Sequence, residues 1–367
     1  MKVLCVADLG ILPEAMENAC KTFLPGAECV VENFPVKSVE FLGKIEENGP
    51  DSIEPLEQFK KHAGEDFDVL IGAIMVPIST QVLDMFPNVK VVGTCRGGLE
   101  DVNMQACKDR NIMVVNAYGR NAEAVSDFTM ALMLSELRNV ARSHADLTRN
   151  GDKETWCTDW VNSSYTPHMC ESTIGIVGYG YIGRLVAKKC AGFGSKIMVY
   201  DEFVSEDEIR KDGYIPVSKE ELFKTADIVS IHLRLVDATR GAISRKDIDS
   251  MKKTAVFINT ARAGVVDYDA LYDALAEKRI GGAAVDVYPE EPLPADSKWR
   301  KLDNITITAH MAGSVLASRP YAAKLITSSI ATAVKGGTTP QIITKDILKT
   351  DEFKEWASTQ YDALVEK

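Results

Sequence analysis

Residues 173–183 read Thr-Ile-Gly-Ile-Val-Gly-Tyr-Gly-Tyr-Ile-Gly, and a helical pattern continues from them to Phe193. The first five are mostly apolar and β-branched, so they predict a buried strand. Gly178, Gly180 and Gly183 then have the G-x-G-x-x-G spacing in the context that this motif requires, after a strand and before a helix. Such glycines permit a tight turn and let the backbone approach a pyrophosphate at the helix N-terminus. The stretch predicts a dinucleotide-binding turn; the alternative is a glycine turn that only packs a helix on a sheet.

The residue after the next predicted strand, Lys196–Tyr200, indicates which coenzyme is bound. Asp201 lies close to the roughly 20-residue distance at which an acid binds the adenosine ribose hydroxyls. Its carboxylate would repel a 2′-phosphate, and neither Glu202 nor Phe203 offers a cation for one. We therefore predict NAD rather than NADP, held by Gly178, Gly180, Tyr181, Ile182, Gly183 and Asp201.

The same alternation of short apolar runs and helical patterns extends over most of the chain. Further strands are predicted at Ile228–His232, Ala255–Asn259, Ala283–Val287 and Ile305–Thr308, and in the first third at Lys2–Ala7, Glu28–Phe34, Asp68–Ala73, Lys90–Gly93 and Ile112–Asn116. Continuous apolar strands suit parallel sheets that are covered on both faces. The sequence thus predicts an α/β protein of two Rossmann-like or flavodoxin-like doubly wound domains with an interdomain cleft.

Two long helical patterns mark the places where the chain passes between the domains. The first covers Asn121–Asn150 without a proline or glycine, and the second covers Ser314–Lys335. We expect a substrate-binding domain of residues 1–121 plus 316–367 and an NAD-binding domain of residues 122–315. A polar stretch after the first helix, Gly151–Ser172, is expected to be a loop.

The composition narrows the class of protein. The 367 residues carry 53 acidic and 42 basic side chains, a net charge of −11, which disfavours binding to nucleic acids and to anionic membranes. No apolar run has the length of a membrane helix. The eight cysteines form no Cys-x-x-Cys pair, and the histidines have no metal-ligand spacing. We expect a cytoplasmic protein with reduced thiols and no metal site.

Three later motifs place polar side chains at the ends of predicted strands. They are Asn259-Thr-Ala-Arg262, Asp286-Val-Tyr-Pro-Glu-Glu291-Pro and Thr308-Ala-His310-Met-Ala-Gly313. A nicotinamide enzyme for hydroxy acids needs a cation for the carboxylate, a proton donor at the carbonyl, and a group that tunes this donor. With the glycine fingerprint, the order and spacing of these motifs resemble the D-isomer-specific 2-hydroxyacid dehydrogenases.

The resemblance implies a catalytic set of Arg262, His310 and Glu291. Arg262 would clamp the substrate carboxylate and keto oxygen with its planar guanidinium. His310 would protonate the carbonyl oxygen as hydride arrives, and Glu291 would favour the protonated imidazole. Glu290 is the rival for this last role, and the plain alternatives are a surface arginine, a structural histidine and an exposed acidic pair. Further coenzyme contacts are implied for His232, Thr260, Ala261, Asp286 and Gly313.

The first domain offers a second set of residues for the substrate. The resemblance assigns Val76, Gly97 and Gly98 to loops that face it. Arg96 and Arg120 depart from the family pattern, and we hypothesise that they bind a second anionic or polyhydroxy group of the substrate. The alternative is that they form salt bridges with nearby acids such as Glu100 or Glu123.

The function expected from these motifs is that of an NAD-dependent D-2-hydroxyacid dehydrogenase or 2-keto acid reductase acting on a small 2-keto or 2-hydroxy acid. One alternative is a phosphoglycerate or sugar-acid phosphate dehydrogenase. Another is a non-catalytic, NAD-sensing, corepressor-like protein, which would bind the coenzyme without turnover. The apolar helical stretch Val125–Leu134 would leave an exposed patch in a monomer, so we also expect a homodimer.

Overall fold

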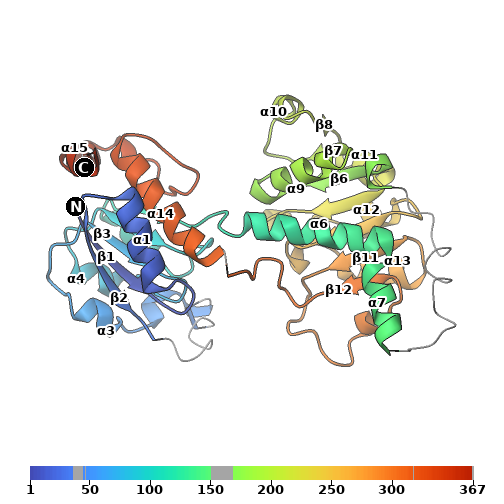
Figure 1. Ribbon diagram of the computed structural model, residues 1–367, viewed down its shortest axis with the longest axis horizontal. Helices are drawn as coiled ribbons and strands as arrows, with labels where there is room; N and C mark the ends of the chain where they lie inside the picture. Colours follow the sequence, from blue (N-terminus) through green and yellow to red (C-terminus); the bar gives the residue numbers. More distant parts are fainter. Residues whose placement is uncertain (36–43, 46, 150–167, 317, 366–367) are drawn as a thin grey trace. The chain divides into compact units, whose positions relative to one another are not determined.

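The computed structural model describes residues 1–35, 44–45, 47–149, 168–316 and 318–365. It divides into two units. Figure 1 shows both, with colours that follow the sequence from the N-terminus to the C-terminus. Unit 1 comprises Met1–Arg120 and Leu316–Lys367, and unit 2 comprises Asn121–Val315. Each unit has a parallel sheet covered by helices, so the predicted fold class of two doubly wound α/β domains is confirmed.

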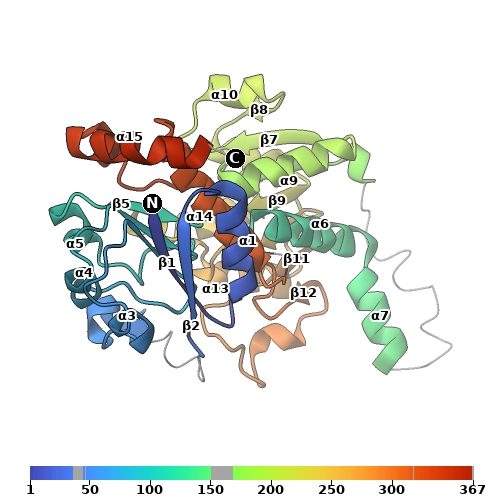
Figure 2. The same cartoon turned by 60° about the vertical axis from the view of Figure 1, so that its left-hand side comes forward.

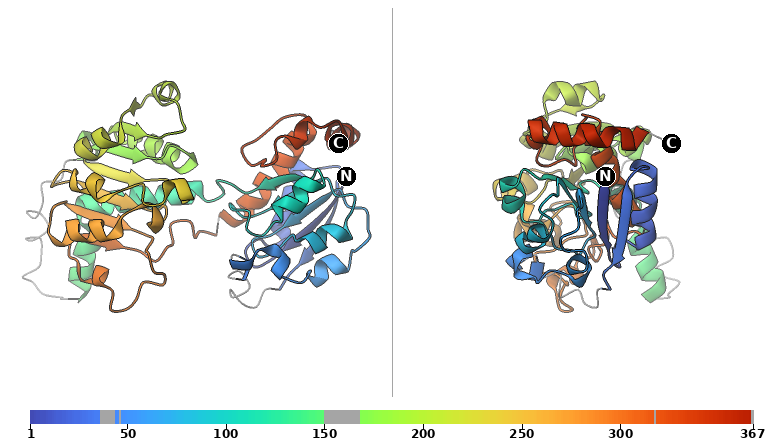
Figure 3. Two further views of the ribbon diagram at one scale, coloured as in Figure 1. Left: turned by 180° about the vertical axis from the view of Figure 1, so that it is seen from behind. Right: turned by 90° about the vertical axis from the view of Figure 1, so that its left-hand side faces the viewer.

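Unit 1 has a five-stranded sheet in the order β2-β1-β3-β4-β5. Its strands are β1 (Lys2–Ala7), β2 (Glu28–Asn33), β3 (Val69–Gly72), β4 (Val91–Thr94) and β5 (Met113–Asn116). Its helices are α1 (Pro13–Phe23), α3 (Glu57–Lys60), α4 (Thr80–Met85), α5 (Met104–Asp109), α14 (Ser318–Val334) and α15 (Asp351–Val365), with short 3-10 turns at Pro50–Ser52 and Ile347–Lys349. Helices α1 and α14 pack together over one face of the sheet (Figure 2), and α4 and α5 lie on the other (Figure 3).

Unit 2 has a seven-stranded sheet in the order β12-β11-β10-β9-β6-β7-β8. Its strands are β6 (Thr173–Val177), β7 (Lys196–Tyr200), β8 (Ile215–Pro216), β9 (Ile228–Ile231), β10 (Val256–Asn259), β11 (Gly282–Val285) and β12 (Ile305–Ile307). Its helices are α6 (Ala122–Arg138), α7 (Val140–Arg149), α9 (Tyr181–Gly192), α10 (Glu206–Lys211), α11 (Lys219–Thr225), α12 (Arg245–Asp249) and α13 (Tyr268–Ala276). Short 3-10 turns lie at Met169–Glu171, Asp237–Thr239, Ala263–Val265 and Lys298–Lys301. Helix α6 packs against α9 on one face of this sheet.

The prediction of one continuous helix over Asn121–Asn150 is wrong, because the chain forms two helices, α6 and α7, that are separated by Asn139. Asn139 has a φ of 52°, a left-handed conformation that asparagine tolerates and that closes a helix. The Arg142 guanidinium fixes the break by donating to the Asn139 side chain at 2.6 Å and to the buried Glu136 carboxylate. Of the predicted loop Gly151–Ser172, residues 151–167 lie outside the described part, and 169–171 form a 3-10 turn.

The prediction of an exposed apolar patch on Val125–Leu134 is also wrong. Val125, Met130, Leu132 and Met133 are at most 7% exposed, because α6 packs against α9 and the sheet. Exposed apolar side chains instead occur on α7, where Val140 is 58% and Leu147 44% exposed. Among the described helices, none combines the length and apolar character that a bilayer crossing requires.

Candidate active site

The glycine fingerprint lies between β6 and α9, where the predicted turn requires residues without side chains. Gly178 has a φ of 94°, and a Cβ there would lie 2.9 Å from the backbone carbonyl of His232. A Cβ on Gly183 would lie 2.0 Å from the carbonyl oxygen of Gly178, so only glycine lets α9 come this close to the turn. No side chain caps the first turn of α9 at Gly180, and its N–H groups can therefore serve an anion.

Asp201 stands at the end of β7, beside the fingerprint. Its carboxylate accepts the N–H of Tyr179 at 2.6 Å and those of Phe203 and Val204 at 2.8 and 3.0 Å. These bonds fix the carboxylate, and its remaining lone pairs can accept from hydroxyl groups. An anionic acceptor in this position fits a ribose diol and disfavours a 2′-phosphate.

His232 lies against Gly178 and is partly buried. Burial lowers its pKa to about 3, so the imidazole is neutral at physiological pH. Its Nε2 bonds to Ser230 Oγ at 2.9 Å, whereas Nδ1 finds no hydrogen-bond partner among the described residues. An unsatisfied buried nitrogen beside a glycine cradle fits a polar group of a bound dinucleotide. The residues present thus fit NAD.

The three predicted catalytic residues follow three neighbouring strands. Arg262 comes after β10, Glu291 after β11 and His310 after β12, and these strands are adjacent in the order β12-β11-β10. Because the strands are parallel, the loops after them meet at one edge of the sheet. The structure therefore brings together side chains that lie up to 48 residues apart in the chain.

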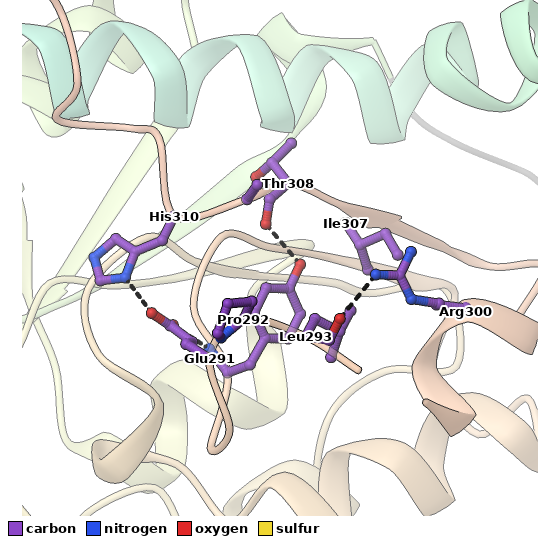
Figure 4. A pocket seen from close by; sticks show the side chains of 9 residues that line it. Glu291, Pro292, Leu293, Arg300, Ile307, Thr308 and His310 are labelled. Atoms are coloured by element: carbon purple, nitrogen blue, oxygen red, sulfur yellow. Dashed lines mark hydrogen bonds and ion pairs between the residues drawn. The ribbon is translucent and has the colours of Figure 1, made fainter. Parts of the chain in front are cut away.

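His310 and Glu291 form a hydrogen-bonded pair, shown in Figure 4. The imidazole Nδ1 lies 2.6 Å from Glu291 Oε2, and Glu291 Oε1 accepts the N–H of Tyr288 at 2.8 Å. Partial burial alone would raise the pKa of Glu291. The hydrogen bonds from His310 and the Tyr288 N–H, together with the charge of Arg262, lower it by more, so the pKa lies below its usual value of 4.5. The carboxylate stays ionised, and it leaves Nε2 of His310 available for a substrate.

Asp286 holds the turn that carries His310. Its side chain is fully buried and accepts the Thr308 hydroxyl at 2.6 Å and the N–H groups of Met311 and Ala312 at 3.0 and 2.8 Å. His310 has a φ of 48°, which is strained for a residue with a side chain and needs support from its surroundings. The geometry gives Asp286 this supporting task, while its predicted contact with the nicotinamide stays a prediction.

Arg262 is presented by a short loop that Asn259 organises. The Asn259 amide accepts the N–H of Ala261 at 3.0 Å and donates to the carbonyl of Arg262 at 3.2 Å. The buried Thr260 bonds through its hydroxyl to Thr129 on α6 at 2.8 Å. Arg262 itself is exposed, and among the described residues its side chain donates only to the neighbouring Ala261 carbonyl, at 2.7 Å, so its guanidinium can turn to an incoming carboxylate.

A pocket of about 560 Å³ adjoins the His310–Glu291 pair (Figure 4). Its walls are mainly apolar and aromatic, with one cation, and are formed by Tyr288, Glu291, Pro292, Leu293, Arg300, Ile307, Thr308, Ala309 and His310. The Tyr288 hydroxyl donates to the Thr308 carbonyl at 2.8 Å, and Arg300 holds the carbonyls of Leu293 and Pro294. Both interactions stiffen the loops around the pair.

The predicted substrate residues of unit 1 lie at the carboxyl edge of its sheet. Val76 is fully buried in the loop after β3, so only its backbone could meet a ligand. Gly97 has open space where a Cβ would stand, whereas Gly98 is closely approached by the Glu100 carboxylate. Arg96 follows β4 and its Nε lies 3.6 Å from Glu100, and Arg120 follows β5.

Several residues of the site were not singled out in the sequence. Asn259 and Tyr288 stand inside the quoted motifs, and their task could have been inferred only from the strand ends that they support. Asn121, which was not singled out, lies against the predicted Gly313, with 2.5 Å between the amide nitrogen and the ideal Cβ position of Gly313.

The chain was compared with protein families and with solved structures. The family model described as D-isomer specific 2-hydroxyacid dehydrogenase, NAD binding domain, matches residues 130–312. The glyoxylate reductase of Korarchaeum cryptofilum is 30% identical over 313 residues, which is 84% of this chain and 93% of that protein. The D-3-phosphoglycerate dehydrogenase of Methanocaldococcus jannaschii is 32% identical over 82% of this chain, which spans only 55% of that relative. The NAD-complexed D-isomer specific 2-hydroxyacid dehydrogenase of Lactobacillus delbrueckii ssp. bulgaricus is 21% identical with a TM-score of 0.72, covering 94% of this chain and 100% of that chain, and so shares the fold.

Proposed function

The chain belongs to the D-isomer-specific 2-hydroxyacid dehydrogenase family, and on that premise we propose that it is an NAD-dependent 2-keto acid reductase, or D-2-hydroxyacid dehydrogenase in the reverse direction. The observation that carries the proposal is the His310–Glu291 pair, at 2.6 Å, on the same sheet edge as Arg262. A cation for a carboxylate and a proton donor beside it are what reduction of a 2-keto acid requires.

Arg262 binds the substrate carboxylate and polarises the keto oxygen with its guanidinium. His310 places Nε2 at the same oxygen, since Nδ1 is committed to Glu291. NADH, when bound, supplies the hydride that reaches C2. As the carbonyl oxygen gains negative charge, His310 gives it the proton from Nε2 and becomes neutral, so the product is the 2-hydroxy acid. In the reverse direction the neutral imidazole removes the hydroxyl proton.

Glu291 acts through His310 rather than on the substrate. Its low pKa keeps a negative charge next to the imidazole over the physiological range, which favours the protonated ring before reduction. Tyr288 and Asp286 hold the two partners at the same place through backbone bonds. The pair is therefore preorganised before the substrate arrives.

The coenzyme is proposed to lie on the fingerprint of unit 2. Gly178, Gly180 and Gly183 would admit the pyrophosphate, with Tyr181 and Ile182 at the start of α9. Asp201 would bind the ribose hydroxyls and His232 Nδ1 would meet a further polar group. The loop Thr260–Ala261, Asp286 and Gly313 complete the proposed set around the catalytic residues.

The substrate is proposed to be held by the loops of unit 1 that contain Val76, Gly97 and Gly98. This proposal is supported by the position of these loops, which follow parallel strands at the sheet edge where ligands of such sheets bind. Backbone N–H groups in a glycine loop can hold a carboxylate without a side chain.

A panel of 2-keto acids assayed with both coenzymes tests the proposal. We expect NADH oxidation with at least one acid from a set that contains glyoxylate, pyruvate and hydroxypyruvate, and a marked preference for NADH over NADPH. Binding of NADH without turnover on any acid would instead favour the NAD-sensing, corepressor-like alternative. A preference for NADPH would overturn the role of Asp201.

We also propose that the protein is a cytoplasmic homodimer. A dimer is supported by the exposed apolar side chains of Val140 and Leu147 on α7, and not by the buried apolar side chains of α6. The support for the compartment is that all seven described cysteines are free thiols. Light scattering at micromolar concentration should give twice the mass of the chain, and a monomer would contradict the proposal.

A further inference from the structure

Tyr268 is the first residue of α13, and the mechanism above gives it no task. The residue is only 6% exposed, and its ring packs edge-on against Trp299 with 5.3 Å between the ring centroids. Phenylalanine would serve this packing equally well. A buried hydroxyl costs free energy unless it is hydrogen-bonded, so the choice of tyrosine calls for an explanation.

The Tyr268 hydroxyl lies between the loops that follow β10 and β11. It accepts from the side-chain amide of Asn259, the last residue of β10, with 3.2 Å between Nδ2 and the hydroxyl oxygen. It donates to the carbonyl of Val287, two residues after the end of β11. A carbonyl can only accept, so the hydroxyl proton is shared with Val287 and a lone pair with Asn259. The hydroxyl therefore joins the loop that carries Arg262 to the loop that carries Glu291.

On the side of β10, the hydroxyl completes the hydrogen bonds of the Asn259 amide. The amide Oδ1 accepts the N–H of Ala261 at 3.0 Å, and Nδ2 donates to the carbonyl of Arg262 at 3.2 Å. The second proton of Nδ2 is taken by Tyr268. Asn259 is fully buried, so without the hydroxyl this proton would lack an acceptor and the amide would be less firmly oriented. The loop of Arg262 would lose part of its support.

On the side of β11, the hydroxyl orients a peptide group that contacts Glu291. The Val287 carbonyl and the Tyr288 N–H belong to one planar peptide bond, so fixing the oxygen also fixes the direction of the N–H. This N–H donates to Glu291 Oε1 at 2.8 Å, and Glu291 Oε2 lies 2.6 Å from His310 Nδ1. A hydrogen bond to the carbonyl also polarises the peptide and strengthens its N–H as a donor. Tyr268 thus reaches His310 through one peptide and one carboxylate.

The hydroxyl keeps its proton over the physiological pH range. Burial raises the pKa of Tyr268 well above its usual value, although the hydrogen bond from Asn259 opposes this effect. A phenolate could not donate to Val287, whereas the neutral phenol can. The link is therefore a fixed support, and it does not act as an acid or a base in the reaction.

We propose that Tyr268 is a positioning residue for the reduction, whose hydroxyl holds the loop of Arg262 and the peptide that directs Glu291 in one arrangement. The inference rests on the proposed reductase function and deepens it, because it couples the guanidinium for the carboxylate to the proton donor. Tyr268 acts through Asn259 and Glu291 rather than on the substrate. Every residue of this link belongs to unit 2.

Removal of the hydroxyl in Tyr268→Phe tests the proposal. The ring is kept, but two buried groups lose their partner, so kcat/KM for reduction should fall about ten-fold. The matched control is Tyr272→Phe on the same helix. Tyr272 also packs against Trp299, with 5.5 Å between the centroids, and among the described residues its hydroxyl has no hydrogen-bond partner. The control should keep the wild-type rate. An undiminished rate in Tyr268→Phe, or an equal loss in Tyr272→Phe, would overturn the proposal.

A double-mutant cycle distinguishes positioning from a general loss of stability. If Tyr268 acts through Glu291, Tyr268→Phe should cost less than about three-fold in the Glu291→Gln background, where the contact is already impaired. The factor that remains is the share that passes through Asn259 to Arg262. The same ten-fold loss in both backgrounds would show a purely structural role and would contradict the proposal.

A proton resonance tests the link without turnover, so failure of the positioning role can be distinguished from failure of the reductase function. The hydrogen-bonded Nδ1 proton of His310 is observed by ¹H NMR and assigned by its absence in His310→Asn. Tyr268→Phe should shift or broaden this resonance, and Tyr272→Phe should leave it in place. A moved resonance supports the link even if no 2-keto acid is reduced, and an unmoved one overturns it even if the enzyme is active.

A second replacement of Tyr268 keeps the test decisive if Tyr268→Phe does not fold. 4-Fluorophenylalanine at position 268 fills the space of the hydroxyl but has no proton to donate to Val287. It should give the same ten-fold loss of kcat/KM and the same change of the His310 resonance. Wild-type values for both quantities would overturn the proposal.

Discussion

Replacing Glu291 by glutamine should slow the reduction of the substrate. The change removes a charge 2.6 Å from the imidazole of His310 and keeps the shape of the side chain. The two oxygens of Glu291 accept from two donors, the ring N–H of His310 and the backbone N–H of Tyr288. Glutamine has one acceptor oxygen, so its NH2 group would face one of these donors. Glu291→Gln thus weakens both the charge and the geometry of the pair.

The magnitude follows from Coulomb's law and the exposure of the pair. Two unit charges about 4 Å apart attract by about 4 kcal/mol at an effective dielectric constant of 20 and about 1 kcal/mol in water. The side chains of His310 and Glu291 are 45% and 35% exposed, which places the pair toward the weaker limit, at about 1–2 kcal/mol. Since about 1.4 kcal/mol is a factor of ten, loss of this attraction should lower kcat/KM for reduction about ten-fold.

The assay is the initial rate of NADH oxidation from pH 5 to 9. From pH 5 to 9, kcat/KM for reduction should be about ten-fold lower in Glu291→Gln than in the wild type, because the Glu291 carboxylate is ionised over this whole range. The pKa of Glu291 lies below 4.5, so the advantage of the wild type persists down to that pH and is lost only as the carboxylate becomes protonated. Glu290→Gln, at the exposed neighbouring residue, is the control. A deficit that disappears within this pH range, or an equal deficit in Glu290→Gln, would refute the reasoning.

Three further predictions concern the support of the site and the core of unit 1. Asp286→Asn should lower kcat about ten-fold or more, because the turn of His310 loses its anchor; an unchanged kcat would contradict this role. Gly183→Ala should lower the free energy of unfolding by about 1–3 kcal/mol and abolish NADH binding, followed by NADH fluorescence. Gly192→Ala, in open space on the same helix, should change neither quantity. Asp101→Asn should gain up to about 3 kcal/mol of stability relative to the wild type between pH 5 and 8, measured by urea unfolding. The buried carboxyl has its pKa raised from 3.8 to about 7, so the wild type loses stability as pH rises through that window. A pH-independent difference would show that the carboxyl titrates normally.

The strand pattern was predictable because parallel strands buried on both faces are continuously apolar. Strands such as Lys2–Ala7 and Thr173–Val177 have the predicted bounds, and most others differ by one or two residues at their ends. Strand β8 was missed since Ile215–Pro216 is too short to show a period. The break at Asn139 was missed because a left-handed residue stabilised by Arg142 leaves no trace in helical periodicity.

The candidate site was predictable to the extent that its residues end strands. Arg262, Glu291 and His310 could be placed because each lies in a motif after a strand, and adjacent parallel strands bring such ends together. Side-chain direction could not be predicted in the same way. Asp286 has both oxygens occupied by the turn of His310, a fact that depends on backbone bonds 25 and 26 residues away.

The most direct test of the account is a comparison of hydride transfer and coenzyme binding in His310→Asn. Asparagine tolerates the left-handed φ of 48° at this position, so the backbone of the turn should be kept. Single-turnover NADH oxidation with the best 2-keto acid of the panel should fall by about 10²–10⁴-fold, while the Kd for NADH changes by less than two-fold. A rate within ten-fold of the wild type would show that His310 is not the proton donor.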